Sequence, residues 1–219
     1  MNYKEILVKI ESQLVGEAHL DHLAKKKQDP FKILISTILS ARTRDANTKI
    51  ATEKLFGKFK TPKAIAEADI DDVEQLIKSS GFYKVKSARI KEVSRILINK
   101  YDAIVPDNYD ELMSLPGVGS KTANCVLVYA FKIPAIPVDT HVHRISNRIG
   151  WVKTKNPKQT EAALKNIVPK ELWLNLNRLF VRFGQQICIP IRPKCNKCII
   201  ENICPKDLSM ELEKKKKKL

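Results

Sequence analysis

The stretch Leu115-Pro-Gly-Val-Gly-Ser-Lys-Thr-Ala123 decides the fold of this chain. Only seven glycines occur among the 219 residues, yet Gly117 and Gly119 stand two residues apart within this stretch. Tyr109 to Ser114 is a short helical candidate before the loop, and Thr122 to Phe131 is an apolar helical candidate after it. The stretch therefore predicts two helices joined by a tight hairpin.

Glycine-rich loops that precede a helix often bind phosphate, and the nucleotide-binding P-loop is the first such class to consider. That motif has Gly directly before Lys and follows a strand. Here Ser120 separates Gly119 from Lys121, and the preceding segment is a helical candidate, so ATP binding is disfavoured. In the alternative, the glycines permit a tight turn and direct backbone N–H groups at a helix N-terminus toward a DNA phosphate. A structural turn without a ligand also stays open on the loop alone.

Basic residues dominate the charge of the chain. Lys and Arg total 40 against 24 Asp and Glu, and the formal net charge of +16 indicates a polyanionic partner. Nucleic acid is favoured over a membrane, because no segment holds the roughly 20 continuous apolar residues of a spanning helix. Met1 to Gln13 interleaves charged and apolar residues and lacks the pattern of a signal peptide. We therefore expect a soluble intracellular protein of the cytoplasm or nucleoid, with a solvated basic tail at its C-terminus.

Apolar residues recur at helical spacing through most of the chain, which predicts an all-α fold. Capping residues, prolines and glycines predict where the helices begin and end. We expect helices that begin at Asp29-Pro30, at about Asp45 and at about Asp71, the last two ending at Gly57 and near Gly81, and a further one from Asp139-Thr140 to about Gly150. The first three carry the apolar residues Ile33, Leu34, Ile38, Leu39, Ile50, Leu55, Phe56, Val73, Leu76 and Ile77. Pro134 and Pro137 interrupt the pattern and mark a domain junction.

Four of the five cysteines form the pattern Cys188-x6-Cys195-x2-Cys198-x5-Cys204 near the C-terminus. This clustering is a poor disulfide framework and indicates a metal site. Four thiolates suit either a [4Fe–4S] cluster or a structural zinc, so the count alone does not choose between them. Zinc ribbons usually carry two Cys-x2-Cys pairs, and the single pair here favours iron–sulfur. Cys125 lies in an apolar stretch and is expected to be a buried, inert thiol.

The glycine-rich stretch is followed by Val138-Asp-Thr-His-Val-His-Arg144. Together the two segments resemble the helix-hairpin-helix and following Asp of the endonuclease III superfamily of DNA glycosylases. Leu39-Ser-Ala-Arg-Thr-Arg-Asp45, Gly81-Phe-Tyr-Lys84 and the cysteine spacing match the same family, over about residues 30 to 204. The resemblance implies an all-α, two-lobed helix-hairpin-helix DNA glycosylase fold with a helical barrel-like domain and an iron–sulfur cluster domain. With the proline-marked junction, it predicts a helical domain at residues 22–133, which includes the hairpin. Residues 1–21 plus 134–219 are expected to form the cluster domain with its basic tail.

The resemblance also implies the chemistry. In that family the Lys that matches Lys121 is the nucleophile, and the Asp that matches Asp139 assists it. A neutral amine can displace a damaged base at the sugar C1′ and leave a Schiff base, which makes a C2′ proton acidic enough for β-elimination of the 3′ phosphate. The implied activity is that of a bifunctional DNA N-glycosylase and AP lyase of base excision repair that removes oxidised pyrimidines of the thymine glycol type. On spacing alone Asp139 is a helix N-cap, and the two roles are compatible.

The partner implied by the resemblance is double-stranded DNA that contains a damaged base or an abasic site. The protein is expected to bind it as a monomer, and no membrane partner is expected. Base removal requires extrusion of the base, which side chains aid by filling the vacated stack. Phe82 matches an apolar wedge of the family, and Arg42 matches a gap-filling position that is often Gln in bacterial members. Because this chain departs from the pattern at Arg42, a phosphate contact or a surface charge is an equal alternative there. The expected DNA contacts are Gly117, Val118, Gly119, Ser120, Arg42, Phe82, Lys84, Arg192, Lys194 and Lys197.

The resemblance implies that the four cysteines hold a [4Fe–4S] cluster that braces a basic surface, in a structural rather than a redox role. His141 and His143 stand one residue apart on a predicted helix and so point to different faces. A shared metal ion is therefore not expected, and structural or DNA-backbone roles are favoured for both histidines.

Three rival functions share parts of this pattern. Adenine glycosylases for mispaired bases have the hairpin, the Asp and the cysteines, but they generally lack the catalytic Lys and carry an added C-terminal recognition domain. Mismatch thymine glycosylases also generally lack that Lys. A noncatalytic DNA-binding module would use the hairpin only to contact phosphate, and the joint presence of Lys121 and Asp139 argues against it.

Overall fold

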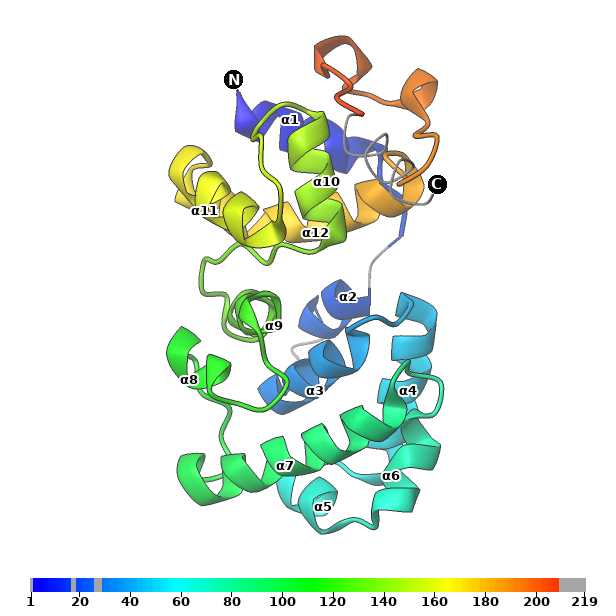
Figure 1. Ribbon diagram of the computed structural model, residues 1–219, viewed down its shortest axis with the longest axis vertical. Helices are drawn as coiled ribbons and strands as arrows, with labels where there is room; N and C mark the ends of the chain where they lie inside the picture. The colour runs from blue at the N-terminus through cyan, green and yellow to red at the C-terminus, as the bar shows by residue number, and fades with distance from the viewer. Residues whose placement is uncertain (1, 17–18, 26–28, 209–219) are drawn as a thin grey trace. The chain divides into compact units, whose positions relative to one another are not determined.

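The computed structural model describes residues 2–16, 19–25 and 29–208 of the chain (Figure 1). All regular secondary structure in these ranges is helical, and none of their residues forms a strand. The all-α prediction is confirmed. The chain divides into two compact units: a continuous unit of residues 18–133, and a discontinuous unit that joins residues 1–17 to residues 134–219. The lysine-rich tail lies outside the described residues.

The continuous unit consists of packed helices with short connections. In chain order they are α2 (His19–Lys25), α3 (Pro30–Ser40), α4 (Asp45–Lys58), α5 (Pro62–Glu67), α6 (Ile70–Ile77), α7 (Tyr83–Tyr101), α8 (Tyr109–Met113), α9 (Ser120–Val126) and the π-helical η1 (Leu127–Phe131). The long helix α7 packs against α5 and α6, while α3 packs against α4 and α9 (Figure 1). The helix α3 is central, because its apolar face is buried along its whole length.

Local capping chemistry sets where several helices begin. The Asp29 carboxylate accepts a hydrogen bond from the backbone N–H of Phe31 at 2.9 Å, and Pro30 occupies the first turn of α3. The Thr61 hydroxyl accepts from the N–H of Ala64 at 3.2 Å before Pro62 in the same way. A side-chain acceptor satisfies an N–H that lacks an intrahelical partner, and Pro has no N–H that needs one. The predicted start at Asp29-Pro30 is confirmed.

The structure departs from the sequence-based prediction in α4 and α9. The helix α4 extends through Gly57 to Lys58, and its Ile50 side chain is 43% exposed instead of joining the core. The start predicted at about Asp71 is confirmed to within one residue, since α6 begins at Ile70 after the Asp69 cap. The helix α9 begins at Ser120, two residues before the predicted start, so that the hairpin ends directly in a helical turn.

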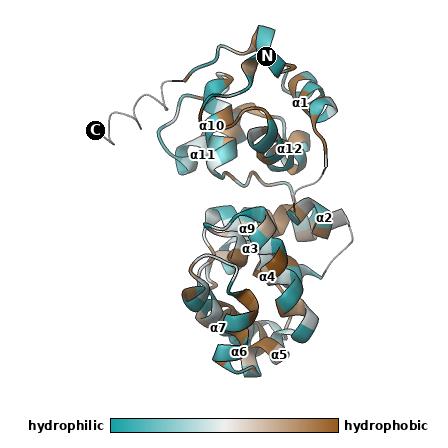
Figure 2. Ribbon diagram, turned by 90° about the vertical axis from the view of Figure 1, so that its right-hand side faces the viewer, coloured by the Kyte–Doolittle hydropathy of each residue, from teal (hydrophilic) through white to brown (hydrophobic). Residues whose placement is uncertain are grey.

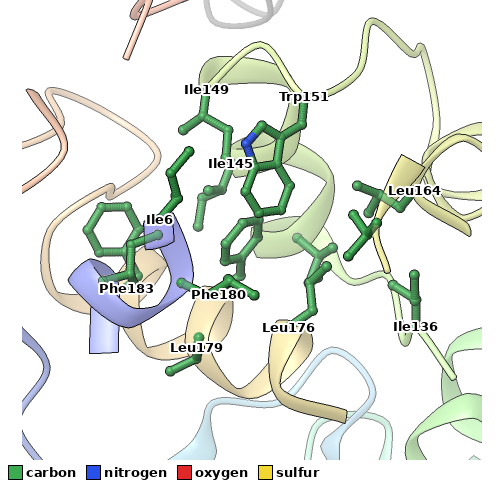
Figure 3. Close-up of a cluster of buried hydrophobic side chains, with 14 of the residues drawn as sticks. Ile6, Ile136, Ile145, Ile149, Trp151, Leu164, Leu176, Leu179, Phe180 and Phe183 are labelled. Atoms are coloured by element: carbon green, nitrogen blue, oxygen red, sulfur yellow. The ribbon is translucent and has the colours of Figure 1, made fainter. Parts of the chain in front are cut away.

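The discontinuous unit contains α1 (Tyr3–Gln13), α10 (Thr140–Arg148), α11 (Pro157–Ile167), η2 (Lys170–Leu172), α12 (Trp173–Gln186), η3 (Cys195–Lys197) and η4 (Glu201–Ile203). Its core, drawn in Figure 3, joins α1 to the C-terminal helices. Trp151 lies against Phe180 with 5.3 Å between the ring centroids, and Ile6 of α1 belongs to the same cluster. The cysteine-bearing segment after α12 packs on this core through Cys188, Cys198 and Cys204.

Hydrophobic and hydrophilic residues alternate along the helices of both units (Figure 2). This mixture is typical of amphipathic helices that bury one face. Within the described ranges, every helix is too short or too polar to cross a lipid bilayer.

Candidate functional site

The predicted hairpin joins α8 to α9. Gly117 has φ of +76°, a left-handed conformation that L side chains rarely adopt, and a Cβ at this position would lie 2.7 Å from Cδ of Arg89. Gly119 differs, because its backbone is extended and a Cβ there would meet no atom within 4 Å. Gly117 is therefore required by the turn, whereas the absence of a side chain at Gly119 leaves the outer face of the loop open.

Val118 closes the turn. Its backbone N–H donates to the carbonyl oxygen of Leu115 at 3.1 Å, and its side chain is buried. The N–H groups best placed for a phosphate are therefore those at the start of α9, where helix geometry supplies no intrahelical acceptor. Among the four predicted contacts in the hairpin, Gly119 and Ser120 fit a backbone contact with DNA better than Val118 does.

Lys121 is the second residue of α9 and is partly exposed. Its position follows directly from the hairpin, because the N–H of Ala123 donates to the carbonyl oxygen of Gly119 at 2.9 Å and so begins the helix. The positive end of a helix dipole lies in this first turn. A lysine amine and the backbone N–H groups at a helix start are therefore presented by the same short segment.

Asp139 caps α10 in the discontinuous unit. Its Oδ1 atom accepts hydrogen bonds from the N–H groups of His141 at 2.9 Å and Val142 at 2.8 Å. The N-cap interpretation is confirmed. Both cap bonds end on one carboxylate oxygen, so that capping engages half of the carboxylate and a second role for the group is compatible with it.

The two histidines of α10 have different partners. His143 is buried, and its Nδ1 atom lies 2.6 Å from the hydroxyl oxygen of Thr160. The Nδ1 atom of His141 lies 3.2 Å from a guanidinium nitrogen of Arg144. His143 therefore has a structural role, since it joins α10 to α11.

Phe82, the predicted wedge, lies beside Arg42, for which gap filling and a phosphate contact or surface charge were equal alternatives. The guanidinium carbon of Arg42 is 5.6 Å from the ring centroid of Phe82, and the Phe82 side chain is 60% exposed. Both residues have left-handed backbones, with φ of 52° and 58°. Such a conformation costs about 1–3 kcal/mol for a residue other than Gly and is found at ligand-binding sites as well as at helix ends. Lys84, a predicted phosphate contact, is exposed two residues further on.

The first turn of α7, directly after the Phe82 loop, contains a residue that the sequence reasoning missed. Lys86 is only 3% exposed, although lysine is almost never buried without partners. The available signal is its spacing, because Lys86, Ile90, Val93 and Leu97 follow the helical period and form one buried face of α7. A lysine at a helix position where the spacing predicts a buried apolar residue indicates a buried, hydrogen-bonded ammonium.

The four clustered cysteines line one pocket that is partly open to solvent. Burial raises the pKa of the Cys198 and Cys204 thiols, and charge on the other cysteines of the pocket raises it further. In the part of the chain that the structure describes, no three potential ligands converge as a single metal ion requires. Four thiol groups around one pocket are a donor set that suits either a [4Fe–4S] cluster or a zinc ion.

Hydrogen bonds from α10 and α1 anchor the cysteine segment. Arg148 of α10 donates to the carbonyl oxygens of Ile189 at 2.7 Å and Pro190 at 2.6 Å, and one of its nitrogens lies 3.4 Å from the Cys188 sulfur. The side chain of Gln13 accepts from the N–H of Ile199 at 3.2 Å. The predicted phosphate contacts of this segment, Arg192, Lys194 and Lys197, are all exposed. The anchored segment therefore presents three cations to solvent.

Comparisons with known proteins agree with this geometry. Residues 35–170 match the model of the HhH-GPD superfamily of base excision DNA repair proteins. An endonuclease III of Thermotoga maritima is 55% identical over 179 residues, which cover 82% of this chain and 84% of that protein. A trapped endonuclease III–DNA covalent intermediate has a TM-score of 0.82 at 34% identity and covers 95% of this chain and 96% of its own. A non-covalent endonuclease III–DNA complex has a TM-score of 0.83 at 35% identity, over 95% of this chain and 94% of its own.

Proposed function

Because the chain belongs to the HhH-GPD superfamily of base excision DNA repair proteins, and within it to the endonuclease III family, we propose that it removes oxidised pyrimidines such as thymine glycol from double-stranded DNA. The enzyme class is that of a DNA glycosylase with AP lyase activity. The observation that carries the proposal is the position of Lys121 in the first helical turn after the hairpin. It supports an amine nucleophile placed next to a phosphate-binding backbone.

In the proposed reaction, the Lys121 amine forms a C–N bond at the sugar C1′ while the glycosidic bond breaks. The base departs with the electron pair of that bond and takes up a proton. Opening of the deoxyribose ring gives a Schiff base, and loss of a C2′ proton then expels the 3′ phosphate by β-elimination. Asp139 stabilises the positive charge that develops on the sugar, or carries protons between these steps.

DNA binding in this proposal combines backbone and stacking contacts. The start of α9 contacts one phosphate, and the exposed cations Lys84, Arg192, Lys194 and Lys197 contact others, in line with the net charge of +16. The exposed ring of Phe82 and the guanidinium of Arg42 fill the stack that the extruded base vacates. We propose a monomer that acts on intracellular DNA, with residues 22–133 as the helical domain and residues 1–21 plus 134–219 as the cluster domain.

We also propose that Cys188, Cys195, Cys198 and Cys204 hold a [4Fe–4S] cluster. Their shared pocket supports a common metal site, and the single Cys-x2-Cys pair favours iron–sulfur over zinc. When bound, the cluster supplies a covalent brace for the segment and no electron to the reaction, since transfer of a glycosyl group to an amine is not a redox step. The chain itself orients the segment through Arg148 and Gln13.

The cluster assignment predicts the colour and metal content of the purified protein. We expect a yellow-brown protein with broad absorbance near the blue end of the visible spectrum and roughly four irons per chain. Iron and zinc analysis after anaerobic purification measures this directly. A colourless protein that contains stoichiometric zinc would contradict the assignment.

A panel of duplexes, each with a single damaged base, tests the proposed activity. Under borohydride we expect a covalent protein–DNA complex with duplexes that contain thymine glycol or an abasic site, because hydride reduces the Schiff base to a stable amine. Duplexes with an undamaged base are the control. If only duplexes with an adenine or thymine mispair were processed, and without any trapped complex, a monofunctional mismatch glycosylase would replace the proposal.

A further inference from the structure

Lys86 lies where the loop between α3 and α4 meets the loop between α6 and α7. Its ammonium nitrogen donates to the carbonyl oxygens of Leu39 and Ala41, each at 2.7 Å. The hydroxyl oxygens of Thr43 at 2.9 Å and Ser80 at 2.8 Å also lie within hydrogen-bond distance of this nitrogen, so its three N–H groups are shared among four acceptors. One cation on α7 is thus bonded to the end of α3 and to both loops.

The same two loops are also bonded to each other. The N–H of Gly81 donates to the hydroxyl oxygen of Thr43 at 3.0 Å, although 38 residues separate them in sequence. The hydroxyl of Ser80 donates to the carbonyl oxygen of Leu39 at 3.0 Å. A Cβ on Gly81 would lie 2.9 Å from the carbonyl oxygen of Arg42, so the two backbones are in close contact. The Lys86 ammonium stands at the centre of this network.

The buried ammonium of Lys86 also depends on the hydrogen-bond acceptors that the two loops and the end of α3 supply. Burial lowers the pKa of Lys86 to about 8, and the charge of Arg89 acts in the same direction. This pKa still lies above neutral pH, so the amine keeps its proton there. A buried charge without acceptors is strongly disfavoured. Carbonyl oxygens at the C-terminal end of α3 lack intrahelical donors and lie at the negative end of the helix dipole. The loops therefore remain where they supply acceptors to the cation.

Arg42 and Phe82 project from these two loops, each from a left-handed backbone. We propose that Lys86 is a positioning residue for base extrusion: its ammonium holds the two loops together so that Arg42 and Phe82 enter the base stack as one unit. This inference rests on the proposed function. It implies that Lys86 affects the removal of a paired base more than strand cleavage at an abasic site, where no base has to leave the stack.

The variant Lys86→Met removes the ammonium and keeps an unbranched side chain. We expect it to slow excision of thymine glycol paired with adenine about tenfold, because part of the help in base extrusion is lost. Cleavage of a preformed abasic site should change by less than about threefold, since its chemistry uses only Lys121 and Asp139. Single-turnover rates on the two substrates measure both effects, and their ratio is the readout.

Lys91 provides the matched control. It is a second buried lysine of α7, and its ammonium donates to the carbonyl oxygens of Ile65 at 3.4 Å and Ala66 at 3.0 Å at the end of α5. The variant Lys91→Met should destabilise the protein in a similar way and leave the ratio of the two rates unchanged. In a Phe82→Ala background, Lys86→Met should lower excision by less than about a further twofold, because it acts through that residue.

The outcomes separate the inference from the proposed function. Lys86→Met could lower the rates on both substrates by the same factor, as expected for Lys91→Met. That result would show a purely structural role for Lys86 and would overturn this inference but not the proposed function. If Lys86→Met does not fold, Ser80→Ala and Thr43→Val each remove one acceptor of the ammonium, and the same ratio decides. A wild-type protein that excises no damaged base would overturn the proposed function, and this inference with it.

Discussion

Replacement of Lys121 by Gln is expected to abolish both the borohydride-trapped complex and strand cleavage. The amide has a similar reach but no nucleophilic lone pair on nitrogen, so no C–N bond to C1′ and no Schiff base can form. Binding to damaged DNA should largely survive, because the affinity comes from many phosphate contacts and the backbone of α9 is unchanged. Trapping, a cleavage assay and a binding titration on one abasic duplex measure the three quantities.

Lys63→Gln is a suitable control, because Lys63 is a lysine of α5 in the same unit with a side chain that is 76% exposed. It removes one charge of the same kind and should leave trapping unchanged. A trapped complex of Lys121→Gln that forms at the wild-type rate would show that the nucleophile is another amine. Loss of DNA binding together with activity would instead indicate a folding defect, which circular dichroism would detect.

Much of the fold could be predicted from sequence where local chemistry fixes the structure. The start of α3 at Asp29-Pro30 and that of α10 at Asp139 depend on hydrogen bonds that span two or three residues. Helix packing is different, because it depends on neighbours that are distant in sequence. Ile50 has the right spacing for a buried residue but is exposed on α4, since propensity and period do not determine which face meets a partner.

The candidate site shows the same contrast between local sequence patterns, which could be predicted, and contacts between distant residues, which could not. The spacing of the four cysteines predicted a common site, and they do line one pocket. The groups that anchor their segment could not be predicted, because Arg148 is 40 residues away from Cys188 and Gln13 is 186 residues away from Ile199. Such contacts exist only once the chain is folded.

Val118 shows the limit of a motif carried over residue by residue. It lies within the glycine-rich stretch, and so it was predicted to contact DNA together with its neighbours. Its N–H is already bonded to Leu115, and its side chain is buried. The motif predicted the hairpin, but the assignment of individual amides to turn or ligand required the backbone geometry.

Asp139→Asn is expected to slow base excision by about a hundredfold or more while DNA binding persists, because the variant lacks the charge that stabilises the developing positive sugar. In this structure the substitution removes the charge of the side chain but keeps the helix cap. The cap of α10 uses only Oδ1 of Asp139, and the amide oxygen of Asn can accept the same two hydrogen bonds. Loss of the negative charge at the helix N-terminus costs about 0.3–1 kcal/mol, so the protein should remain folded. Single-turnover excision rates and thermal unfolding measure the two effects.

Asp69→Asn is the control for the cap itself, since Asp69 caps α6 by accepting from the N–H of Asp71 at 2.8 Å. It loses the same charge at an equivalent position of another helix, and should leave excision at the wild-type rate. A further variant, Asp139→Ala, removes cap and charge together and should add about 1 kcal/mol of destabilisation to the same catalytic loss. If Asp139→Asn excised thymine glycol as fast as the wild type, the carboxylate would be a helix cap alone, and stabilisation of the sugar cation would have to come from another group.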